Sequence, residues 1–356
     1  MRVNIKFGLS SLFLSIGLVS VLGTAGCSDS TQQQSQQENT TVSADKPKEV
    51  RLAWGGGPRV WVLGKADGDF EKALGTKIKW VEFASGADVL NYFAANEIDI
   101  ARFGSNPAIA AISRGLPIEV IGLEGLVGSA ERLTVKSNIQ NVHDLLGKKV
   151  AFPANSTAQY ALEQLLALEK VDKSQVKLLP LKPAEIVSAW TRGDIDAAYV
   201  WGPFTQQLEK QGGHSIFQTT QLNEQGILVY NNFAVRKEFA EKYPALVVQF
   251  LKTYQEQVDE YQKDPKQAAE KISKYLNLPY EQVETTLAGI QYIPLKEQAT
   301  EKYLGSKAND TGSGLAKASD DIAKFLVNIG ELKQSDVKAS YAPYINTQYL
   351  REAAAQ

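Results

Sequence analysis

The sequence predicts an α/β fold of two lobes followed by a helical tail, and three observations support this. Short β-rich runs alternate with helical patterns as far as Val235, which is typical of α/β architecture. Beyond Lys237 the spacing is helical, with few strand signals. The segments 96–101 and 193–198 resemble each other, and each follows a predicted helix and opens a strand. We therefore expect two lobes built on a related plan.

The first residues predict an export signal that ends at a lipidated cysteine. Arg2 and Lys6 precede an apolar run over residues 7–22, and small residues lead to Cys27. The run is too short to span a bilayer comfortably, which disfavours a retained membrane anchor. Cys27 is the only cysteine, and its context resembles a bacterial lipobox, although Thr24 stands where leucine is usual. We expect residues 1–26 to be removed and Cys27 to carry the lipid.

The next segment and the composition limit the class of protein. Residues 27–48 are polar and predict a flexible tether, because they offer too little apolar surface to fold. Removing residues 1–26 changes the charge balance from 38 − 40 = −2 to 36 − 40 = −4. A mildly acidic chain without a basic run disfavours nucleic acid as a partner. With two histidines, His143 and His214, and one cysteine, no metal site and no cofactor are expected.

About 300 residues remain for the folded part, enough for two domains of ordinary size. The predicted strands are 49–54, 77–83, 98–103, 117–123, 133–135, 149–152, 176–179, 195–200 and 231–235. The predicted helices are 88–96, 108–114, 142–146, 157–169, 183–192, 238–263, 265–276, 279–290 and 314–328. Pro244, Pro265 and Pro279 fall at helix starts, where the missing N–H costs least.

Several of these segments resemble the solute-binding proteins of taurine, aliphatic sulfonate and nitrate ABC importers, with the taurine branch most similar. The resemblance rests on the segments PIEV (117–120), DLLGKKVA (144–151), AWTRGDID (189–196), AYVWGP (198–203) and VRKEFAEK (235–242). The GDID segment is common across the wider family, whereas YVWGP is more specific. The match extends over most of residues 49–348.

The resemblance implies a type II-like periplasmic binding protein fold, in which two lobes joined by two crossing strands close over a solute. Residues 131–135 and 232–236 would be the crossings. Lobe one would comprise 49–132 and 236–356, and lobe two 133–235. The implied function is the extracytoplasmic binding component of an ABC importer, a monomer held by the Cys27 lipid in the periplasm or on the outer face of the cytoplasmic membrane, delivering a small sulfonate to a permease.

A sulfonate stays ionised at neutral pH, so hydrogen-bond donors must bind it. Helix N-termini supply free N–H groups and a partial positive charge. Small polar residues stand where predicted helices follow strands, and helix capping alone would also explain them. The candidate ligand-binding residues of this kind are Ser85, Ser105, Asn106, Asn155, Ser156 and Thr157.

Aromatic residues near strand ends are candidates for contact with the carbon chain of the solute. Trp54, Tyr160 and Trp201 are expected to contribute, although aromatics at such positions are more often core. Trp190 has apolar helical spacing and is expected in the core. Arg59 follows a glycine-rich loop and is expected to be solvated.

Asn231 is the residue at which this sequence departs from the taurine branch. As we align it, an aspartate suited to an ammonium group stands at this position in that branch. An asparagine keeps the hydrogen bonds but loses the charge, and a buried ammonium without a partner is costly. We expect either a solute without a strong amine, or one whose amine is met by Asp88, Glu124 or Glu131.

Other functions stay open at this stage. Nitrate, bicarbonate or a thiamine-pyrimidine precursor are alternative solutes, and a receptor that transports nothing would have the same tether. Aromatics near the cleft favour a solute with carbon atoms. An enzyme is not expected, because we find no reactive lysine, cysteine–histidine cluster or cofactor motif.

Overall fold

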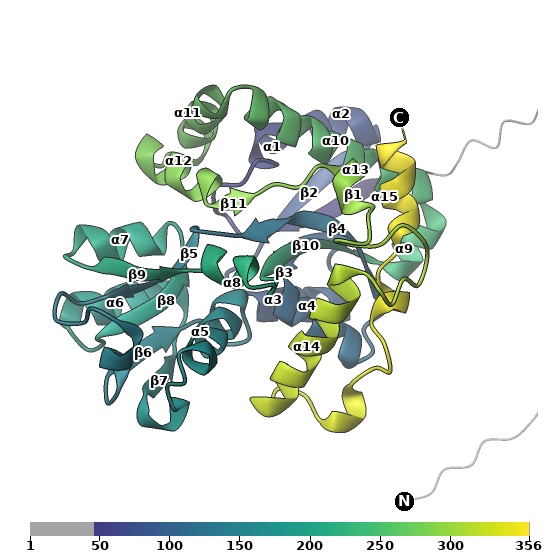
Figure 1. The fold of residues 1–356 in the computed structure, drawn as a ribbon. Helices are drawn as coiled ribbons and strands as arrows, with labels where there is room; N and C mark the ends of the chain where they lie inside the picture. Colours follow the sequence, from purple (N-terminus) through teal and green to yellow (C-terminus); the bar gives the residue numbers. More distant parts are fainter. Residues whose placement is uncertain (1–45, 356) are drawn as a thin grey trace, which may run out of the picture. The chain divides into compact units, whose positions relative to one another are not determined.

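The structure is a computed structural model that describes residues 46–355. The predicted signal peptide, the lipidation site at Cys27 and nearly all of the tether lie outside these residues. The strands of the described chain form two sheets, shown in Figure 1, with helices packed around them. The predicted α/β class is confirmed.

The first sheet combines parallel and antiparallel strands in the order β11-β4-β10-β3-β1-β2. β1 pairs in parallel with β2 and β3, whereas β10 pairs antiparallel with β3 and β4, and β4 antiparallel with β11. The bounds are β1 Glu49–Trp54, β2 Lys77–Glu82, β3 Ile100–Gly104, β4 Ile118–Val127, β10 Tyr230–Arg236 and β11 Ile290–Gln291.

The second sheet follows the same scheme in the order β7-β6-β8-β5-β9. β6 pairs in parallel with β7 and β8, and β5 pairs antiparallel with β8 and β9. The bounds are β5 Glu131–Val135, β6 Lys149–Phe152, β7 Lys177–Pro180, β8 Ala197–Trp201 and β9 His214–Gln218.

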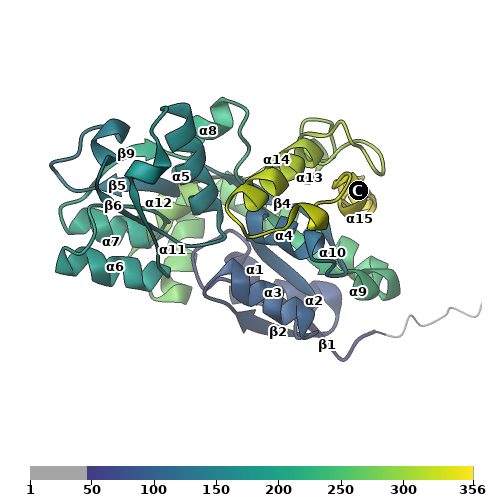
Figure 2. The ribbon, with the colours of Figure 1, turned by 90° about the horizontal axis from the view of Figure 1, so that it is seen from below.

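Helices cover both faces of the first sheet. Figure 1 shows α1, α2 and α10 on one side of it and α3, α4 and α14 on the other, and Figure 2 shows the same layers from below. The bounds are α1 Val62–Asp67, α2 Asp69–Leu74, α3 Gly86–Ala94, α4 Ser105–Ser113, α5 Thr157–Leu168, α6 Pro183–Arg192, α7 Phe204–Lys210, α8 Thr220–Glu224, α9 Lys237–Lys242, α10 Pro244–Lys263, α11 Pro265–Leu276, α12 Tyr280–Ala288, α13 Leu295–Gln298, α14 Gly314–Asn328 and α15 Thr347–Ala354. Within residues 46–355, no helix is both long enough and apolar enough to cross a bilayer.

Most predicted elements are confirmed within a few residues, and the differences are local. The predicted helix 238–263 is two helices, because Pro244 starts α10 directly after α9 ends. The segment 142–146 is a short 3-10 helix (Val142–Leu145). The helices α1, α2 and α7 and the strand β9 were not predicted, because these runs of five to seven residues are too short for a clear period.

The crossings between the sheets differ from those that the resemblance implied. β5 lies entirely in the second sheet and β10 entirely in the first. The chain therefore passes between the sheets at 128–130 and at 225–229, not within 131–135 and 232–236. By sheet membership, lobe two extends from β5 to α8, which moves both predicted lobe boundaries toward the N-terminus.

The resemblance between segments 96–101 and 193–198 has a structural basis. The carboxylate of Asp99 accepts a hydrogen bond of 2.9 Å from the backbone N–H of Arg51, and Asp196 accepts one of 2.8 Å from Lys149 N–H. In return, the backbone N–H groups of Asp99 and Asp196 each donate 2.9 Å bonds to the carbonyls of Arg51 and Lys149. Each aspartate thus pins the start of the neighbouring parallel strand, once in each sheet.

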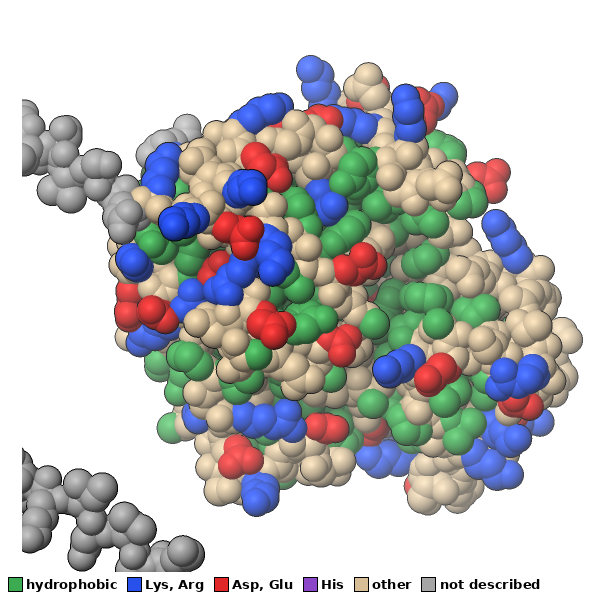
Figure 3. Space-filling model, turned by 180° about the vertical axis from the view of Figure 1, so that it is seen from behind, with side chains coloured by type: hydrophobic (Ala, Val, Ile, Leu, Met, Phe, Trp, Pro, Cys, Tyr) green, Lys and Arg blue, Asp and Glu red, His purple; other side chains and the backbone are tan. Residues whose placement is uncertain are grey.

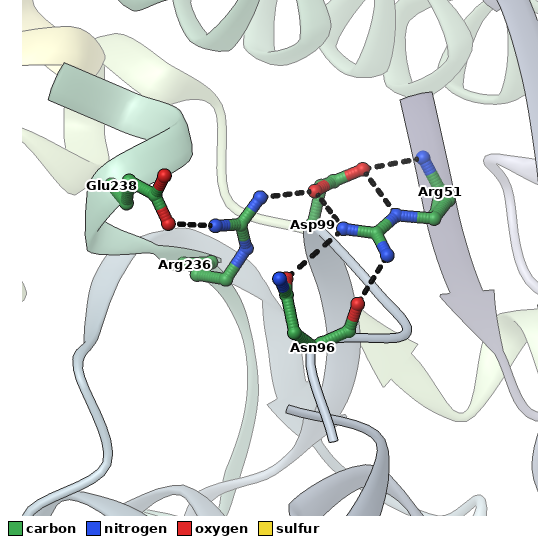
Figure 4. Close-up of polar contacts among 5 residues, drawn as sticks. All are labelled: Arg51, Asn96, Asp99, Arg236 and Glu238. Atoms are coloured by element: carbon green, nitrogen blue, oxygen red, sulfur yellow. Dashed lines mark hydrogen bonds and ion pairs between the residues drawn. The ribbon is translucent and has the colours of Figure 1, made fainter. Parts of the chain in front are cut away.

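In the first sheet this aspartate is also the buried centre of an ion cluster (Figure 4). Arg51 and Arg236 contact the same Asp99 oxygen at 2.6 and 2.8 Å, and Arg236 also contacts Glu238 at 2.6 Å. Burial would raise the pKa of Asp99, but hydrogen bonds from the two arginines outweigh it and hold the pKa below its ordinary value. The cluster ties β1, β3 and β10 together at the sheet edge where β1 begins.

Candidate functional site

A cavity of about 290 Å³ lies between the two sheets, at the carboxyl ends of parallel strands. Trp54 ends β1, Gly104 ends β3 and Trp201 ends β8, and all three line it. Ligands in open α/β sheets bind at this edge. In the view from behind, hydrophobic side chains gather in a hollow near the middle of the surface (Figure 3).

Three helices begin at the wall of this cavity. α3, α4 and α5 have nine, nine and twelve residues, and their N-caps are Ser85, Gly104 and Ser156. All three N-caps line the cavity. The first N–H groups of a helix lack intrahelical partners and carry a partial positive charge, so the wall favours an anion.

The capping residues differ in how far their side chains are already bonded. The Ser156 hydroxyl donates to the Pro153 carbonyl at 2.6 Å and accepts from Gln159 N–H at 3.2 Å. Ser85 shares a capping box with Asp88, whose carboxylate accepts its N–H at 2.9 Å. Gly104 has no side chain to cap α4, so this helix presents its backbone alone.

Two arginines and one glutamate form a buried charged group on the first-sheet side of the cavity. Arg59 Nε lies 3.4 Å from Glu124 Oε1, and Arg102 donates a bond of 3.3 Å to Glu124 Oε2. The glutamate side chain is fully buried, and the two arginine side chains are 10% and 12% exposed. Both arginines line the cavity. Two guanidinium groups share one carboxylate, which leaves one positive charge for a bound anion.

Strand register places Arg102 on the α10 side of the first sheet. Arg102 pairs with Phe233, which contacts Phe250 and Tyr254 of α10. Directly opposed residues in an antiparallel pair point to the same face. The Tyr254 hydroxyl donates to the Glu124 carbonyl, so α10 also fixes the backbone beside the charged group.

Glu131 faces the cavity from the second sheet. It is 4% exposed, and its Oε1 accepts a bond of 2.6 Å from the Thr157 hydroxyl. Its other oxygen, Oε2, is buried and has no partner among the described residues. Burial raises the pKa of Glu131 to about 7, against the opposing effects of Thr157, Arg59 and Arg102. At neutral pH this carboxyl is therefore poised between its two protonation states.

The rest of the wall is largely apolar. Trp54, Trp61, Phe83, Trp201, Phe204 and Leu278 line the cavity. Trp54 is held edge-on against Trp80, with ring centroids 6.4 Å apart, and Lys65 Nζ lies 4.4 Å from its ring centroid. Such a wall suits the carbon chain of an organic ion.

The structure brings most of the predicted site residues together. Those that line the cavity are Trp54, Ser85, Asn155, Ser156, Thr157, Trp201 and Asn231. Asn155 has a left-handed backbone (φ 47°), and its side-chain oxygen is buried without a partner in the described chain. Contact of these residues with a solute remains a prediction.

Three predicted residues lie outside the cavity wall. Ser105 and Asn106 are fully buried, and the serine hydroxyl donates to the Asn106 side-chain oxygen at 3.2 Å. Tyr160 packs edge-on against Phe325 of α14, with ring centroids 5.0 Å apart. The segment where β3 ends and α4 begins does line the cavity, but it does so with Gly104 and Pro107.

Two arginines line the cavity, although neither was among the site residues that the sequence predicted. Arg59 was expected in solvent, but it is 8% exposed and lines the cavity. Arg102 was not selected from the sequence, although a charged residue between Ala101 and Phe103, near the carboxyl end of a predicted strand, was a signal that could have identified it. Phe83 and Phe204 were also missed, because only the tertiary structure turns them into the cavity. Trp190 is 1% exposed, which confirms that it belongs to the core.

Comparisons with known proteins place the chain among relatives. The model of the NMT1-like family matches residues 44–277. The taurine-binding periplasmic protein of Escherichia coli (strain K12) is 32% identical over 296 residues, which cover 81% of this chain and 88% of the relative. The family match includes every residue that lines the cavity except Leu278.

Solved structures share the fold. The alkanesulfonate-binding protein SsuA from Xanthomonas axonopodis pv. citri, bound to MOPS, superposes with a TM-score of 0.70 at 24% identity, over 82% of this chain and 96% of that one. The desulfurization enzyme DszB superposes with a TM-score of 0.61 at 14% identity, over 86% and 99%. The fold therefore occurs in binding proteins and in an enzyme, and function has to be argued from the cavity.

Proposed function

The chain belongs to the NMT1-like family, and from that premise we propose that it is the extracytoplasmic solute-binding component of an ABC importer. It holds a small organic sulfonate in the cavity between the two sheets and delivers it to a permease. The observation that carries the proposal is the pair of buried arginines, Arg59 and Arg102, which share the single carboxylate of Glu124 beside three helix N-termini.

The chemistry of the cavity suits an anion that cannot be protonated. A sulfonate presents three acceptor oxygens, and the wall offers guanidinium groups and the free N–H groups of α3, α4 and α5. A buried excess of positive charge is costly without a counter-ion, so binding an anion relieves it. A neutral sugar or an apolar solute would leave that charge unpaired.

The apolar part of the wall favours an organic solute over a bare inorganic anion. Trp54, Phe83 and Trp201 offer more apolar contact than nitrate or bicarbonate could use. The relative from Escherichia coli is named for taurine, a two-carbon sulfonate, and is similar along 81% of this chain. Taurine and short alkanesulfonates are therefore the first solutes to test.

Export and membrane attachment form part of the same proposal. The signal segment and Cys27 would place the protein in the periplasm or on the outer face of the cytoplasmic membrane, held by lipid and acting as a monomer. The similar protein from Escherichia coli is periplasmic by name. Labelling with a radioactive fatty acid, which a Cys27→Ser variant should lose, tests the anchor.

We propose capture and release of the solute rather than catalysis. In the described chain, no histidine, lysine or cysteine lines the cavity. Both oxygens of Glu124 face arginines, and one oxygen of Glu131 accepts a hydrogen bond from Thr157. Incubating the protein with sulfonates and measuring released sulfite or sulfate tests this, because catalysis would consume the solute.

Isothermal titration of the purified protein against taurine, ethanesulfonate, nitrate and glycine betaine tests the substrate class. We expect a sulfonate to bind with a Kd of about 1 μM, near −8 kcal/mol. Arg102→Gln should abolish sulfonate binding, whereas Arg114→Gln, on the surface, should not. Binding of nitrate or betaine in preference to both sulfonates would contradict the proposal.

A further inference from the structure

A lysine that does not itself line the cavity contacts three aromatic rings next to the cavity wall. Lys65 of α1 is half-buried, and its Nζ lies 4.4 Å from the ring centroid of Trp54, 5.1 Å from that of Trp80 and 5.2 Å from that of Tyr275. It also donates a hydrogen bond of 2.9 Å to the Tyr275 hydroxyl. Each ring attracts a cation at such a distance, so the three contacts hold the ammonium group in place.

The rings, and no carboxylate, hold this lysine within the described chain. None of the ion pairs among residues 46–355 includes Lys65, and Asp67, two residues further along α1, pairs instead with Lys271 of α11. A lysine that only needs hydration keeps its charged end in water. The placement of Lys65 therefore couples its charge to the aromatic side chains.

Two of the three rings support the wall of the cavity. Trp54 ends β1 and lines the cavity. Because Leu52 pairs with Trp80 in the parallel register of β1 and β2, Trp54 and Trp80 lie on the same face of the sheet, and their rings meet edge-on. Trp80 also meets Trp61, another residue of the wall, with ring centroids 5.4 Å apart. Lys65 is thus bound to the aromatic layer that forms this part of the wall.

The third ring connects Lys65 with a second part of the wall. The helices α1 and α11 are neighbours (Figure 1), and Tyr275 belongs to the last turn of α11. Leu278, three residues later, lines the cavity. Ser273 fixes this turn, because its carbonyl accepts the Leu278 N–H at 3.1 Å and its hydroxyl donates to the Leu278 carbonyl at 2.6 Å. The contact of Lys65 with Tyr275 therefore helps to place Leu278.

We propose that Lys65 is a positioning residue, which holds Trp54 and, through Tyr275, Leu278 against the carbon chain of the bound sulfonate. This inference rests on the proposed function and concerns how the cavity recognises the apolar part of its solute. One ammonium group joins α1 with rings from β1, β2 and α11. Without it the Trp54 side chain is less ordered, and ordering it when the solute binds costs affinity.

The effect of Lys65 should depend on the length of the carbon chain. In the proposed function, Arg59, Arg102 and the helix N-termini bind the sulfonate group, whereas Trp54 and Leu278 offer apolar contact. Loss of the lysine should therefore weaken the binding of butanesulfonate more than that of methanesulfonate, whose single carbon has little surface to bury. A general disturbance of the fold would weaken both.

Titration calorimetry of the wild type and of Lys65→Met, with methanesulfonate and butanesulfonate as probes, tests the inference. Methionine has a similar length but no charge. We expect butanesulfonate affinity to fall about tenfold and methanesulfonate affinity to fall by less than about twofold. Lys65→Arg keeps a cation against the rings and should bind both solutes within about twofold of the wild type.

Two further variants keep the test decisive. Lys136→Met is the matched control, because Lys136 Nζ lies 4.0 Å from the ring centroid of Trp190, which belongs to the core of the second sheet and does not line the cavity. It should leave both affinities unchanged. Tyr275→Phe, at an exposed side chain, removes only the hydroxyl that Lys65 bonds, and should lower butanesulfonate affinity about threefold even if Lys65→Met folds poorly.

A double-mutant cycle tests whether Lys65 acts through Trp54. In the Trp54→Leu background, Lys65→Met should cause no further loss of butanesulfonate affinity, because the ring that it positions is gone. Additive losses would show that the lysine acts by another route and would overturn the inference.

The calorimetry also separates this inference from the proposed function. If the wild type binds both sulfonates and Lys65→Met leaves the ratio of the two affinities unchanged, the positioning role is overturned while the sulfonate site stands. If the wild type binds neither sulfonate, the proposed function fails, and the inference fails with it.

Discussion

The hydroxyl of Thr157 donates a 2.6 Å hydrogen bond to Glu131 Oε1, while the methyl group of the same threonine faces Gly104 across the cavity. One residue at the start of α5 thus orients the acid of the second sheet and touches the end of β3 in the first. The position of the carboxylate and the approach of the two sheets are therefore set by the same side chain.

Glu131 should make the stability of the protein depend on pH. Its pKa is about 7 in the folded chain and 4.5 in the ordinary state, so the folded protein holds more protons between these values. Stability is then lost as the pH rises from about 4.5 to about 7, by on the order of 3 kcal/mol. Glu131→Gln should remove this loss, which urea unfolding at about pH 5 and about pH 8 measures. The prediction would be contradicted if the free energy of unfolding changed by the same amount between these pH values in the wild type and in the variant.

Gly104→Ala should weaken solute binding. A Cβ at this position would lie 3.1 Å from Thr157 Cγ2 and 3.8 Å from Asn231 Oδ1, so it would press the two sheets apart or narrow the cavity. We expect a loss of affinity of about tenfold, comparable with mild overpacking. Gly57→Ala is the matched control, because its Cβ would meet no atom within 4 Å although Gly57 also lines the cavity.

Arg102→Met should cost both stability and anion binding, because it leaves Glu124 buried with one partner. We expect a loss of about 3 kcal/mol in the free energy of unfolding. The double variant with Glu124→Gln should recover much of that stability, since it removes the unpaired charge, but should not recover sulfonate binding. Recovery of both would show that Arg102 has only a structural role.

Asp99→Asn should destabilise the protein at neutral pH by about 3 kcal/mol, because Arg51 and Arg236 lose their shared partner. The pKa of Asp99 is held below its ordinary value, so the stability it provides is present at neutral pH and is lost as the pH falls below about 4. Acid unfolding should therefore be less steep in the variant. Solute binding should persist, since this cluster does not line the cavity.

Asn231→Asp should shift the preference of the cavity toward a solute that carries an amine. Asn231 lines the cavity and pairs with Gly104 at the end of β3. A second carboxylate there would attract an ammonium and repel a solute that carries only a sulfonate, so the ratio of taurine to ethanesulfonate affinity should rise about tenfold. Competition titration of the two solutes measures the ratio directly, and a fall in the ratio would contradict the assignment of charge in the cavity.

Local patterns were enough to place the parallel strands and the helices that follow them. The alternation in 77–83 and the Ser-led helix start at 156–157 predicted β2 and α5, because these signals depend on neighbours in the sequence. The repeated aspartates at 99 and 196 also indicated related structures, since each accepts a backbone hydrogen bond near the start of the adjacent parallel strand, from Arg51 of β1 and from Lys149 of β6.

The sequence determined the α/β class, the two related lobes, the helical tail and most of the residues at the carboxyl ends of the strands. Only the tertiary structure decided which charges meet. Arg59, Arg102 and Glu124 lie in three separate segments, and whether each faces solvent or its partners depends on strand register and on the packing of α10. The same holds for Glu131. One of its oxygens accepts a bond from Thr157 and the other is buried without a partner in the described chain, and both features depend on contacts between distant parts of the chain.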